Sequence, residues 1–382
     1  RIWAGDVFKF RMVKWLYRRP ITITERSGNN LTDYAVRIDL NSTNFDSWDR
    51  ILYANGSDVF FTDINGSLLY YWIEEFNKTA QKAIIWVKVP YIPANGNTTI
   101  YMYYGVENTY YTDYHNGSKV FFFFDDFETL KSGWKTYGSG TLSISDGWLE
   151  MHVTDSYFFA YQNITFTRNI SMRTRVKPVQ PASYDNKYGR YQFGVAEHMF
   201  PLNQYTEIDT GYRVYIDIDT TIKVTGLKGG TGWLLIDASG LFDVSIIHKY
   251  ELMITSTNIT FYIDDLYIGT KYDTNITSFI NVFLRVFGGG DVINAFDFVL
   301  LRNITYPEPI YTINPEEAIS LIFLYNKIGK QMGRSTYCEV LNATTKEVIL
   351  SGYYTSRIPL PTIGTFILRV YYNGILIKNI TI

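Results

Sequence analysis

The residues of this sequence that point most directly to chemistry are asparagines followed two positions later by serine or threonine. Such a triplet, with any residue except proline at its centre, is the acceptor for N-linked glycosylation, which attaches a sugar to the asparagine side chain. The stretch ILYANGSDVFFTDINGSLLYYW, residues 51–72, contains two acceptors, Asn55 and Asn65, on either side of a strand-like segment.

Fourteen of these triplets occur in the chain, and none has proline at its centre. With 25 asparagines and this content of serine and threonine, chance would give about four. The excess favours glycosylation over the alternative that asparagine and threonine are simply abundant in turns. The predicted acceptors are Asn30, Asn41, Asn55, Asn65, Asn77, Asn97, Asn116, Asn163, Asn169, Asn258, Asn275, Asn303, Asn342 and Asn379.

The spacing within six of the triplets, Asn-Ile-Thr or Asn-Ile-Ser, fits a β-strand with one wet face. Side chains alternate between the two faces of a strand, so the asparagine and the hydroxyl residue point one way and the isoleucine the other. In NITFYI, residues 258–263, this predicts buried Ile259, Phe261 and Ile263 and an outward Asn258. Asn379 fits less well, because it shares its face with other isoleucines.

Composition excludes several classes of protein. Hydrophobic residues make up 46% of the 382 residues and aromatic residues 17%, which is enough for large cores and excludes general disorder. The net charge of −2 provides no basic field for nucleic acid. Cys338 is the only cysteine, so an intrachain disulfide is excluded, and its alternating surroundings favour a small buried side chain. We expect no transmembrane segment, and the start at Arg1 suggests a processed chain.

The elements expected from hydrophobic periodicity are almost all β-strands. YAVRIDL, residues 34–40, and RVYIDID, residues 213–219, alternate apolar and polar side chains, and glycine, asparagine and aspartate mark the turns. Many short strands of this kind predict β-sandwiches. Boundaries fall in the polar stretch before residue 116 and in TYPEPIYTINPEE, where three prolines forbid a central strand. We therefore predict an extended amino-terminal strand over 1–14 and three tandem domains over 15–115, 116–308 and 309–382.

Residues 15–105 resemble a surface-protein module of bacteria and archaea that is catalogued as domain of unknown function 2341. The resemblance is carried in order by WLYRRPITI (15–23), LTDYAVRIDL (31–40), NGSDVFFTDINGSLLYYWIEEF (55–76) and IWVKVPYIPANGNTTIYMYYG (85–105). It implies a β-sandwich on a cell surface and a modular architecture, but the family has no activity to transfer.

Residues 120–309 resemble a concanavalin A-like lectin or glucanase jelly roll. The matching stretches are VFFFFDDFE (120–128), GWLEMHV (147–153), FYIDDLYIG (261–269) and FDFVLLRNITYPEP (296–309). The pattern of short strands in residues 310–382 is similar to that of a small immunoglobulin-like sandwich. Together these resemblances predict an all-β chain of three tandem sandwiches.

The jelly-roll resemblance requires a test for hydrolase chemistry. One hydrolase family on this fold carries Glu-x-Asp-x-x-Glu on a single strand, so that alternation brings three carboxyl groups to one groove. TEIDTGYR supplies Glu207 and Asp209, but Tyr212 stands where the general acid is needed. Scattered histidines and the lack of a Gly-x-Ser-x-Gly elbow exclude other common hydrolytic sites. We therefore predict that the chain is not an enzyme.

A structural calcium is the metal site that the resemblance implies. Its ligands would be Asp125, Asp126, Glu128 and Asp297, because carboxylate oxygens near the first and last strands suit this ion. The alternative is that these carboxylates accept hydrogen bonds from turn backbone. Exposed tryptophans and tyrosines, including Trp134, Trp148 and Trp233, could instead stack on sugars, although aromatic side chains are more often used in cores.

The first thirteen residues, RIWAGDVFKFRMV, have the alternation of a strand without a domain of their own. Phe8, Phe10 and Met12 would occupy one face. The strand could pair within its own chain, or it could complete a sheet in the next copy. Strand donation of that kind, repeated head to tail, builds a homopolymer.

These observations lead to one hypothesis and one alternative. The chain is predicted to be an archaeal, N-glycosylated structural subunit of an extracellular pilus-like filament or envelope layer on the cell surface. The alternative is a lectin-like adhesin that binds carbohydrate through the jelly roll. No cofactor is expected apart from covalent glycans and the calcium considered above, and nucleic acid is not an expected partner.

Overall fold

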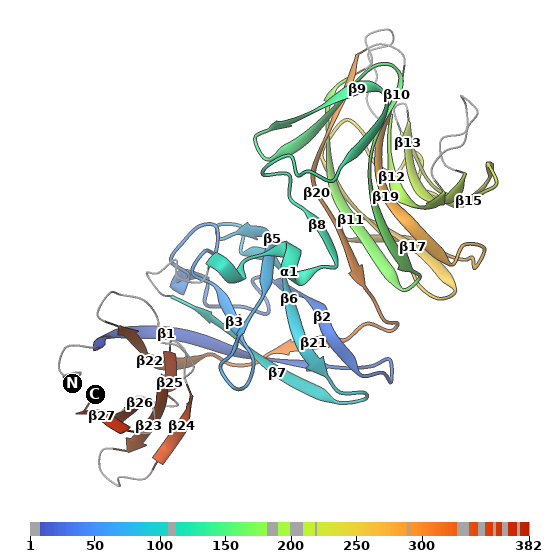
Figure 1. Cartoon of the computed structure of the whole chain (residues 1–382). Coiled ribbons are helices and arrows are strands. Elements are labelled where there is room, and N and C mark those ends of the chain that lie inside the picture. Colours follow the sequence, from blue (N-terminus) through green and yellow to red (C-terminus); the bar gives the residue numbers. More distant parts are fainter. Residues whose placement is uncertain are drawn as a thin grey trace. The chain divides into compact units, whose positions relative to one another are not determined.

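The computed structural model describes residues 8–105, 112–181, 190–198, 209–217, 220–288, 291–326, 336–342, 348–353, 357–360, 366–372 and 375–381. The chain divides into two compact units. Unit 1 comprises Arg1–Asn116 and Pro309–Ile382, and unit 2 comprises Gly117–Glu308. Both are built almost entirely of β-strands, as the alternating sequence predicted (Figure 1). The limits of unit 2 fall where the polar and proline-rich stretches placed the boundaries.

Unit 2 contains one continuous sheet that folds back on itself into two layers. Its described elements are α1 (Gly117–Val120), β8 (Phe123–Asp125), β9 (Lys135–Ser145), β10 (Trp148–Thr167), β11 (Ile170–Gln180), β12 (Tyr191–His198), β13 (Thr210–Asp217), β14 (Thr221–Lys228), β15 (Thr231–Asp237), β16 (His248–Ile254), β17 (Asn258–Ile263), β18 (Leu266–Tyr272), β19 (Ser278–Phe287) and β20 (Val292–Asn303). The strand order is β15-β14-β13-β12-β19-β10-β20-β11-β16-β17-β18, with β9 beside β10 and β8 beside β20.

The long strand β10 connects the two layers. Its first part, Leu149–Val153, pairs with β20, and its second part, from Tyr157 onward, pairs with β19. Layer A therefore consists of β15, β14, β13, β12, β19, the second part of β10 and part of β9. Layer B consists of the first part of β10 with β20, β11, β16, β17 and β18. A sheet that folds over in this way can bury one face of each layer against the other.

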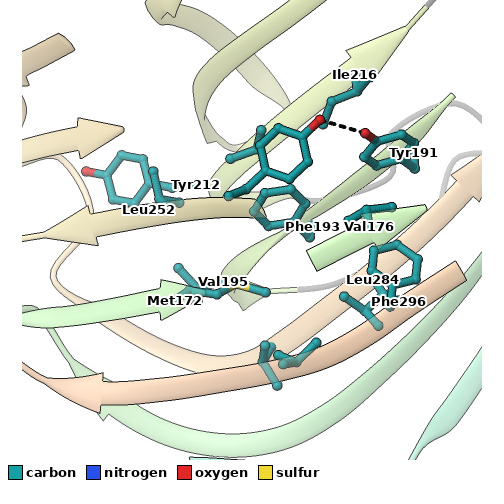
Figure 2. Packing of buried hydrophobic residues seen from close by; sticks show 14 of the residues in the cluster. Met172, Val176, Tyr191, Phe193, Val195, Tyr212, Ile216, Leu252, Leu284 and Phe296 are labelled. Carbon is teal, nitrogen blue, oxygen red and sulfur yellow. Dashed lines mark hydrogen bonds between the residues drawn. The ribbon is translucent and has the colours of Figure 1, made fainter. Parts of the chain in front are cut away.

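The core of unit 2 lies between these layers. Both contribute side chains that are fully buried, among them Phe193 and Val195 of layer A and Leu252 and Phe296 of layer B (Figure 2). Complete burial of one such side chain contributes about 1.5–3 kcal/mol. Two tyrosine hydroxyls within the core satisfy each other, because those of Tyr191 and Tyr250 lie 2.7 Å apart.

Strand alternation was predicted correctly at the positions that can be compared. Ile259, Phe261 and Ile263 are each fully buried in β17, while Asn258 is half-buried. In unit 1 the strand over residues 34–40 buries its apolar side chains and leaves its charged ones half-exposed. Glycines 229 and 230 form the turn between β14 and β15, and both have a positive φ, which glycine adopts without the steric cost of a Cβ.

Unit 1 contains three sheets. Its described elements are β1 (Phe8–Thr24), β2 (Leu31–Leu40), η1 (Trp48–Arg50), β3 (Phe60–Thr62), β4 (Leu68–Leu69), β5 (Tyr71–Asn77), β6 (Lys82–Ile92), β7 (Asn97–Tyr104), η2 (Thr112–Tyr114), β21 (Ile310–Ile313), β22 (Glu317–Asn326), β23 (Thr336–Asn342), β24 (Val348–Tyr353), β25 (Arg357–Leu360), β26 (Phe366–Tyr372) and β27 (Ile375–Thr381). The sheet orders are β25-β22-β1-β7-β3-β4 with β21 beside β1, β2-β6-β5, and β24-β23-β26-β27. A core of aromatic and aliphatic side chains includes Trp48, Phe60 and Ile85.

The amino-terminal segment differs from the separate strand predicted over 1–14. It is part of β1, which runs without a break from Phe8 to Thr24. Residues 8–13 pair with β22 of the same chain, from Phe8 opposite Asn326 to Val13 opposite Leu321. The structure thus has the within-chain pairing that the sequence left open as the alternative to strand donation. The backbone positions of Phe8, Phe10 and Met12, proposed for contact with another copy, all lie in this register.

The carboxyl-terminal segment also differs from the domain predicted over 309–382. β21 and β22 join the sheet of β1 and β7, because Ile21 lies opposite Ile313 and Arg18 opposite Glu317. Only β23, β24, β26 and β27 form a sheet of their own. The sequence divided the chain after residue 308 because of its prolines, but it gave no sign that the following strands return to the first sheet.

Candidate functional site

The predicted glycosylation acceptors lie where a sugar can be attached. Side-chain exposure is described for twelve of them, and ten of these are exposed, while Asn116 and Asn258 are half-buried. Among the residues whose exposure is described, the buried asparagines are Asn281 and Asn294, and both are outside the Asn-x-Ser/Thr triplets. Asn342 and Asn379 lie in β23 and β27, and their side chains are outside the described residues. Exposure therefore agrees with the acceptor hypothesis, and attachment itself stays a prediction.

Several acceptors stand in turns that use the side-chain oxygen and leave the nitrogen to other roles. The backbone N–H of Thr43 donates to Asn41 Oδ1 at 2.8 Å, and that of Ser57 donates to Asn55 Oδ1 at 3.2 Å. The N–H of Ala80 donates in the same way to Asn77 Oδ1 at 2.9 Å. Such turns depend on the oxygen. A sugar on the nitrogen is compatible with each of them.

The five acceptors of unit 2 gather towards one end of its sheet. Asn303 pairs opposite Ile170, and the N–H of Asn169 donates to the carbonyl of Ile254 at 2.7 Å. Asn258 begins the strand that follows, Asn275 lies between β18 and β19, and Asn163 is near the end of β10. The connections at the opposite end, which follow β11, β13, β15, β17 and β19, contain no acceptor triplet.

The four carboxylates proposed for calcium do not form a common site. Asp125 accepts hydrogen bonds from the Phe127 N–H at 3.1 Å and the Trp134 indole N–H at 2.8 Å. Lys131 lies near Asp125 and Asp126, whereas Asp297 pairs with Arg175. Within the described parts of the chain, no three histidine, cysteine, aspartate or glutamate side chains gather as metal ligands would. Asp125 therefore fits the alternative, in which a turn carboxylate accepts hydrogen bonds from the backbone.

The hydrolase-like positions also have structural partners. Glu207 lies outside the described residues, and Asp209 precedes β13. Tyr212 is fully buried, and its hydroxyl donates to the Asp273 carboxylate and accepts from Arg168 Nη1 at 3.0 Å. Burial, together with the hydrogen bond to Asp273, raises the pKa of Tyr212 to about 12. A tyrosine that stays neutral and hydrogen-bonded in this way cannot replace a carboxylic acid that protonates a leaving group.

The Tyr212 network ties together three connections at the acceptor-rich end of unit 2. Arg168 donates to the carbonyls of Thr255 at 2.6 Å, Ile276 at 2.7 Å and Asp273 at 2.6 Å. The indole N–H of Trp233 donates to the Asp273 carboxylate at 2.8 Å. The indole N–H groups of Trp134 and Trp233, both candidates for sugar stacking, therefore donate hydrogen bonds within the fold.

His248 forms a second buried polar site, at the other end of unit 2. It is 3% exposed, with Nδ1 2.7 Å from Asp264 Oδ2 and Nε2 2.8 Å from the carbonyl of Asp243. Burial alone would lower the pKa of His248, but the two acceptors outweigh it and raise the pKa above its ordinary value. Because both ring nitrogens face acceptors, the protonated imidazole fits this site best.

Charged residues on the outward side of layer B are paired with one another. Arg173, which is 1% exposed, contacts Glu251 at 2.8 Å and Asp265 at 2.6 Å. Arg302 contacts Glu308 at 2.7 Å. Buried pairs of this kind fix one arrangement of strands more than they stabilise it. We assign them a structural role.

Unit 1 contains a polar groove of about 580 Å³, lined by Arg19, Asp46, Ser47, Asp49, Arg50, Ile313, Pro315 and Glu316. Its two arginines are engaged inside the groove, since Arg19 pairs with Asp46 and Arg50 with Glu316. The guanidinium of Arg50 also lies 4.5 Å from the centre of the Tyr17 ring. The groove is thus a junction that joins η1 and β1 to the segment after β21.

The outward face of layer A has a different character, because aromatic rings and arginines alternate across it. β10 turns Phe158 and Ala160 to the core and Tyr157, Phe159 and Tyr161 to the other side. We call the set on that other side the aromatic–arginine face. It consists of Tyr137, Tyr157, Phe159, Tyr161, Gln192, Arg213, Tyr215, Phe283, Arg285 and Phe287. Four of its members are buried, Tyr137 is exposed and the rest are half-buried; the buried ones are Phe159, Gln192, Phe283 and Arg285.

Strand register builds this face. Phe159 lies opposite Arg285, which lies opposite Gln192, which in turn lies opposite Tyr215. The next row runs from Tyr161 through Phe283 and Gly194 to Arg213. A Cβ on Gly194 would collide with the carbonyl of Tyr212 and lie 3.0 Å from the Phe283 ring. The glycine therefore lets the Phe283 ring lie close to the strand.

The rings of this face are held in fixed stacks. Tyr137 stacks on Tyr157 with centroids 6.0 Å apart, and Tyr215 stacks on Phe287 at 5.4 Å. The Arg285 guanidinium is 4.7 Å from the centre of Phe287 and 5.1 Å from that of Phe159. Cation–π contacts of this type are worth about 0.5–2 kcal/mol each.

Polar groups accompany the rings. Arg213 donates to Gln192 Oε1 at 3.2 Å and to Thr225 Oγ1 at 3.1 Å. Gln192 is fully buried, and its Nε2 finds no hydrogen-bond partner in the structure as described. The hydroxyl of Tyr215 donates to Asp217 at 2.6 Å. The face thus offers apolar rings next to donors and acceptors.

The sequence did not identify this face. It singled out the tryptophans, of which Trp148 lies between two cations of layer B, 5.5 Å from Arg175 and 4.7 Å from Lys177. A signal was nonetheless present, because YFFAY, residues 157–161, is apolar on both faces of its strand. A strand with two apolar faces has to cover both, or to offer one of them to a ligand.

No helix of the described chain has the length and apolar character needed to cross a membrane. Among curated protein sequences, none matches the chain. Solved structures resemble it over about half of its length. A carbohydrate-binding module from Bacillus subtilis, CBM66, shares 16% identity and covers 46% of this chain and 99% of its own, with a TM-score of 0.35.

Two further structures are similar to the same extent. A β-glucanase from Bacillus licheniformis shares 12% identity over 47% of this chain and 97% of its own, with a TM-score of 0.35. A Bacillus subtilis protein of unknown function with a galectin-like fold shares 14% identity over 48% and 96%, with a TM-score of 0.39. At these identities the likeness concerns the fold alone.

A family model matches one part of the sequence. The matched residues, 55–137, lie mostly in unit 1 and extend into unit 2, so they begin and end later than the resemblance over 15–105. The model is the one expected from the sequence, domain of unknown function 2341, and the match covers well under half of the chain. The chain thus contains a segment that matches the model of domain of unknown function 2341, and its second unit is a two-layered β-sheet.

Proposed function

We propose that this protein is an extracellular, N-glycosylated surface protein that binds carbohydrate through the aromatic–arginine face of unit 2. The observation that carries the proposal is the second apolar face of β10, where Tyr157, Phe159 and Tyr161 point away from the core. Phe159 is fully buried in a small cluster with Phe283, whereas Tyr157 and Tyr161 at its margin are half-buried and Tyr137 is 47% exposed. These tyrosines, which lie beside arginine side chains, are the rings that a ligand can reach.

Carbohydrate suits this combination of groups. A sugar ring has an apolar face of C–H groups that packs on aromatic rings, and hydroxyl groups at its rim that need hydrogen bonds. Tyr137 is 47% exposed and rests on Tyr157, so it offers a supported platform. The half-buried Tyr215, whose hydroxyl donates to Asp217, supplies polar groups in the adjoining rows.

Binding to a glycan array, followed by titration with the best ligand, tests the proposal. The variants Tyr137→Ala and Tyr215→Ala should each weaken binding about two- to tenfold, because one aromatic contact contributes about 0.5–1.5 kcal/mol. Tyr267→Ala is the matched control, since Tyr267 is 56% exposed on β18 of layer B. If the unchanged protein binds no glycan, or if all three variants bind equally well, the face is not a carbohydrate site.

The role of a filament or envelope-layer subunit stays a prediction from the sequence. β22 supplies within the chain the partner that strand donation would have needed from another copy. Electron microscopy of cell-surface preparations tests the role directly, because ordered polymers would support it and dispersed particles would contradict it. No catalytic activity is proposed.

A further inference from the structure

One of the predicted glycosylation acceptors lies on the aromatic–arginine face itself. Residues 157, 159, 161 and 163 alternate with core residues along β10, so Asn163 shares a face with Tyr157, Phe159 and Tyr161. Its partner across the strands is Asn281, which precedes Phe283 and Arg285 on the same face of β19. Asn163 is exposed, and so is Thr165, the hydroxyl residue of its triplet.

We propose that the glycan on Asn163 lies along the aromatic–arginine face and acts as an intramolecular ligand of that face. The inference rests on the proposed function and identifies the chain's own N-linked sugar as a ligand of the same site. The other four acceptors of unit 2 differ, because they lie in turns or strands of the acceptor-rich end and do not share the row of rings on β10.

Geometry makes the contact easy to form. Tyr161 is two residues from Asn163 on the same face, and Tyr157 is six residues away, which corresponds to about 20 Å of extended strand. A short chain of sugar units can follow that path without any movement of the strand. The rings it meets are already fixed, because Tyr157 is stacked on Tyr137 and packs near the Arg285 guanidinium, whose centre is 5.6 Å from the ring.

Tethering also makes a weak site effective. A ligand held by a short flexible link has an effective concentration in the millimolar range. A face that binds a free sugar with a dissociation constant of about 1 mM would therefore be occupied by its own glycan for most of the time. External glycans would compete with it, so the attached sugar would raise the concentration of external glycan that is needed for binding.

Nuclear magnetic resonance of the full chain with isotope-labelled glycans tests the contact directly. Ring C–H protons that pack on aromatic side chains shift upfield. We expect such shifts for the glycan on Asn163, and we expect them to disappear in Tyr161→Ala. The glycan on Asn303 serves as the internal control, because Asn303 is exposed at the end of β20 in layer B.

Competition supplies the second readout. Asn163→Gln and Thr165→Ala both remove the acceptor triplet and should strengthen binding of an external glycan about three- to tenfold, whereas Asn303→Gln should leave it unchanged. Mass spectrometry that finds Asn163 bare would overturn the inference. So would a glycan on Asn163 whose protons match those on Asn303.

The two proposals fail in different ways. If no external glycan binds to any variant, including Asn163→Gln, the proposed function is wrong. If external glycans bind but the Asn163 sugar shows neither an upfield shift nor competition, the face binds carbohydrate and only the intramolecular contact is wrong.

Discussion

Single residues in unit 2 show how polar groups are used to hold a β-sandwich. The carboxylate of Asp273 collects donors from Tyr212 and from the Trp233 indole, and its backbone carbonyl accepts from Arg168. Every member is buried or half-buried, so each lost partner leaves a group unsatisfied away from water. The network therefore specifies where the connections at this end of the sheet lie.

Tyr212→Phe should lower the free energy of unfolding by about 1–3 kcal/mol, because it removes one donor to the Asp273 carboxylate and one acceptor of Arg168 while the aromatic volume is retained. Chemical denaturation followed by circular dichroism measures the change. Tyr137→Phe is the control, since Tyr137 is largely exposed and should lose less than about 0.5 kcal/mol. Equal effects of the two variants would show that the Tyr212 network does not contribute to stability.

His248 predicts a dependence of stability on pH. Its pKa is raised in the folded protein, so the folded state holds this proton more tightly than the unfolded chain, where the pKa is about 6.5. The contribution is fully present below about pH 6.5 and is lost as the pH rises through the folded pKa. Melting temperatures recorded from pH 5.5 to 8.5 should therefore fall less steeply for His248→Gln than for the unchanged chain.

The matched control for that measurement is His152→Gln. His152 also lies near an aspartate, with Nε2 3.2 Å from Asp291, but at a position that is partly exposed. This variant controls for the substitution itself, since a change of slope seen in both variants would not be assigned to His248. Parallel curves for the unchanged protein and His248→Gln would mean that the buried imidazole contributes nothing in this range.

The sequence revealed part of this picture and not the rest. Exposure of the acceptor asparagines and burial of Ile259, Phe261 and Ile263 follow from alternation, which is local. The partners of Tyr212 are remote, since Arg168 is 44 residues away and Asp273 is 61 residues away along the chain. Strand register brings them together, and a single sequence does not specify register.

At the scale of elements, two strands do most to shape the molecule. β10 belongs to both layers of unit 2 and presents an apolar face on each side. β1 pairs with β7, β21 and β22 and so joins the two ends of unit 1. The strands themselves were predicted from alternation. Their pairings were not, because the partners of β1 lie on either side of an intervening domain.

Deletion of residues 1–13 should expose the edge of β22. The pairs from Phe8–Asn326 to Val13–Leu321 would be lost, and an unpaired edge invites proteolysis and aggregation. Limited proteolysis should then cut within residues 317–326, whereas deletion of residues 1–7 alone should leave the pattern unchanged. A truncated chain as resistant as the intact one would mean that residues 8–13 do not protect the edge of β22.

At the scale of the whole chain, unit 2 is inserted into unit 1. Residues 117–308 have their own core and both of their connections to the rest of the chain. Fragment 117–308 expressed alone should therefore fold cooperatively, with a single thermal transition and the strand signal of a β-sandwich in circular dichroism. A fragment that unfolds gradually, or that aggregates on expression, would show that the core between the layers is insufficient.

The acceptor asparagines are unevenly distributed over the surface of unit 2. In unit 2 they lie towards the end where the chain enters through β8 and leaves after β20, and the connections at the opposite end carry none. That end is therefore expected to stay accessible if the acceptors carry glycans. The sequence contained this asymmetry, but it became visible only when the strand order showed which turns lie together.

The return of β21 and β22 to β1 has a consequence for how the chain is made. A polypeptide that emerges amino end first presents β1 long before residues 310–326 exist, so one edge of that strand must wait while the whole inserted domain is synthesised. At typical rates of 5–20 residues per second the delay is about 15–60 s. During that interval the half-built sheet is open to chaperones and to neighbouring nascent chains.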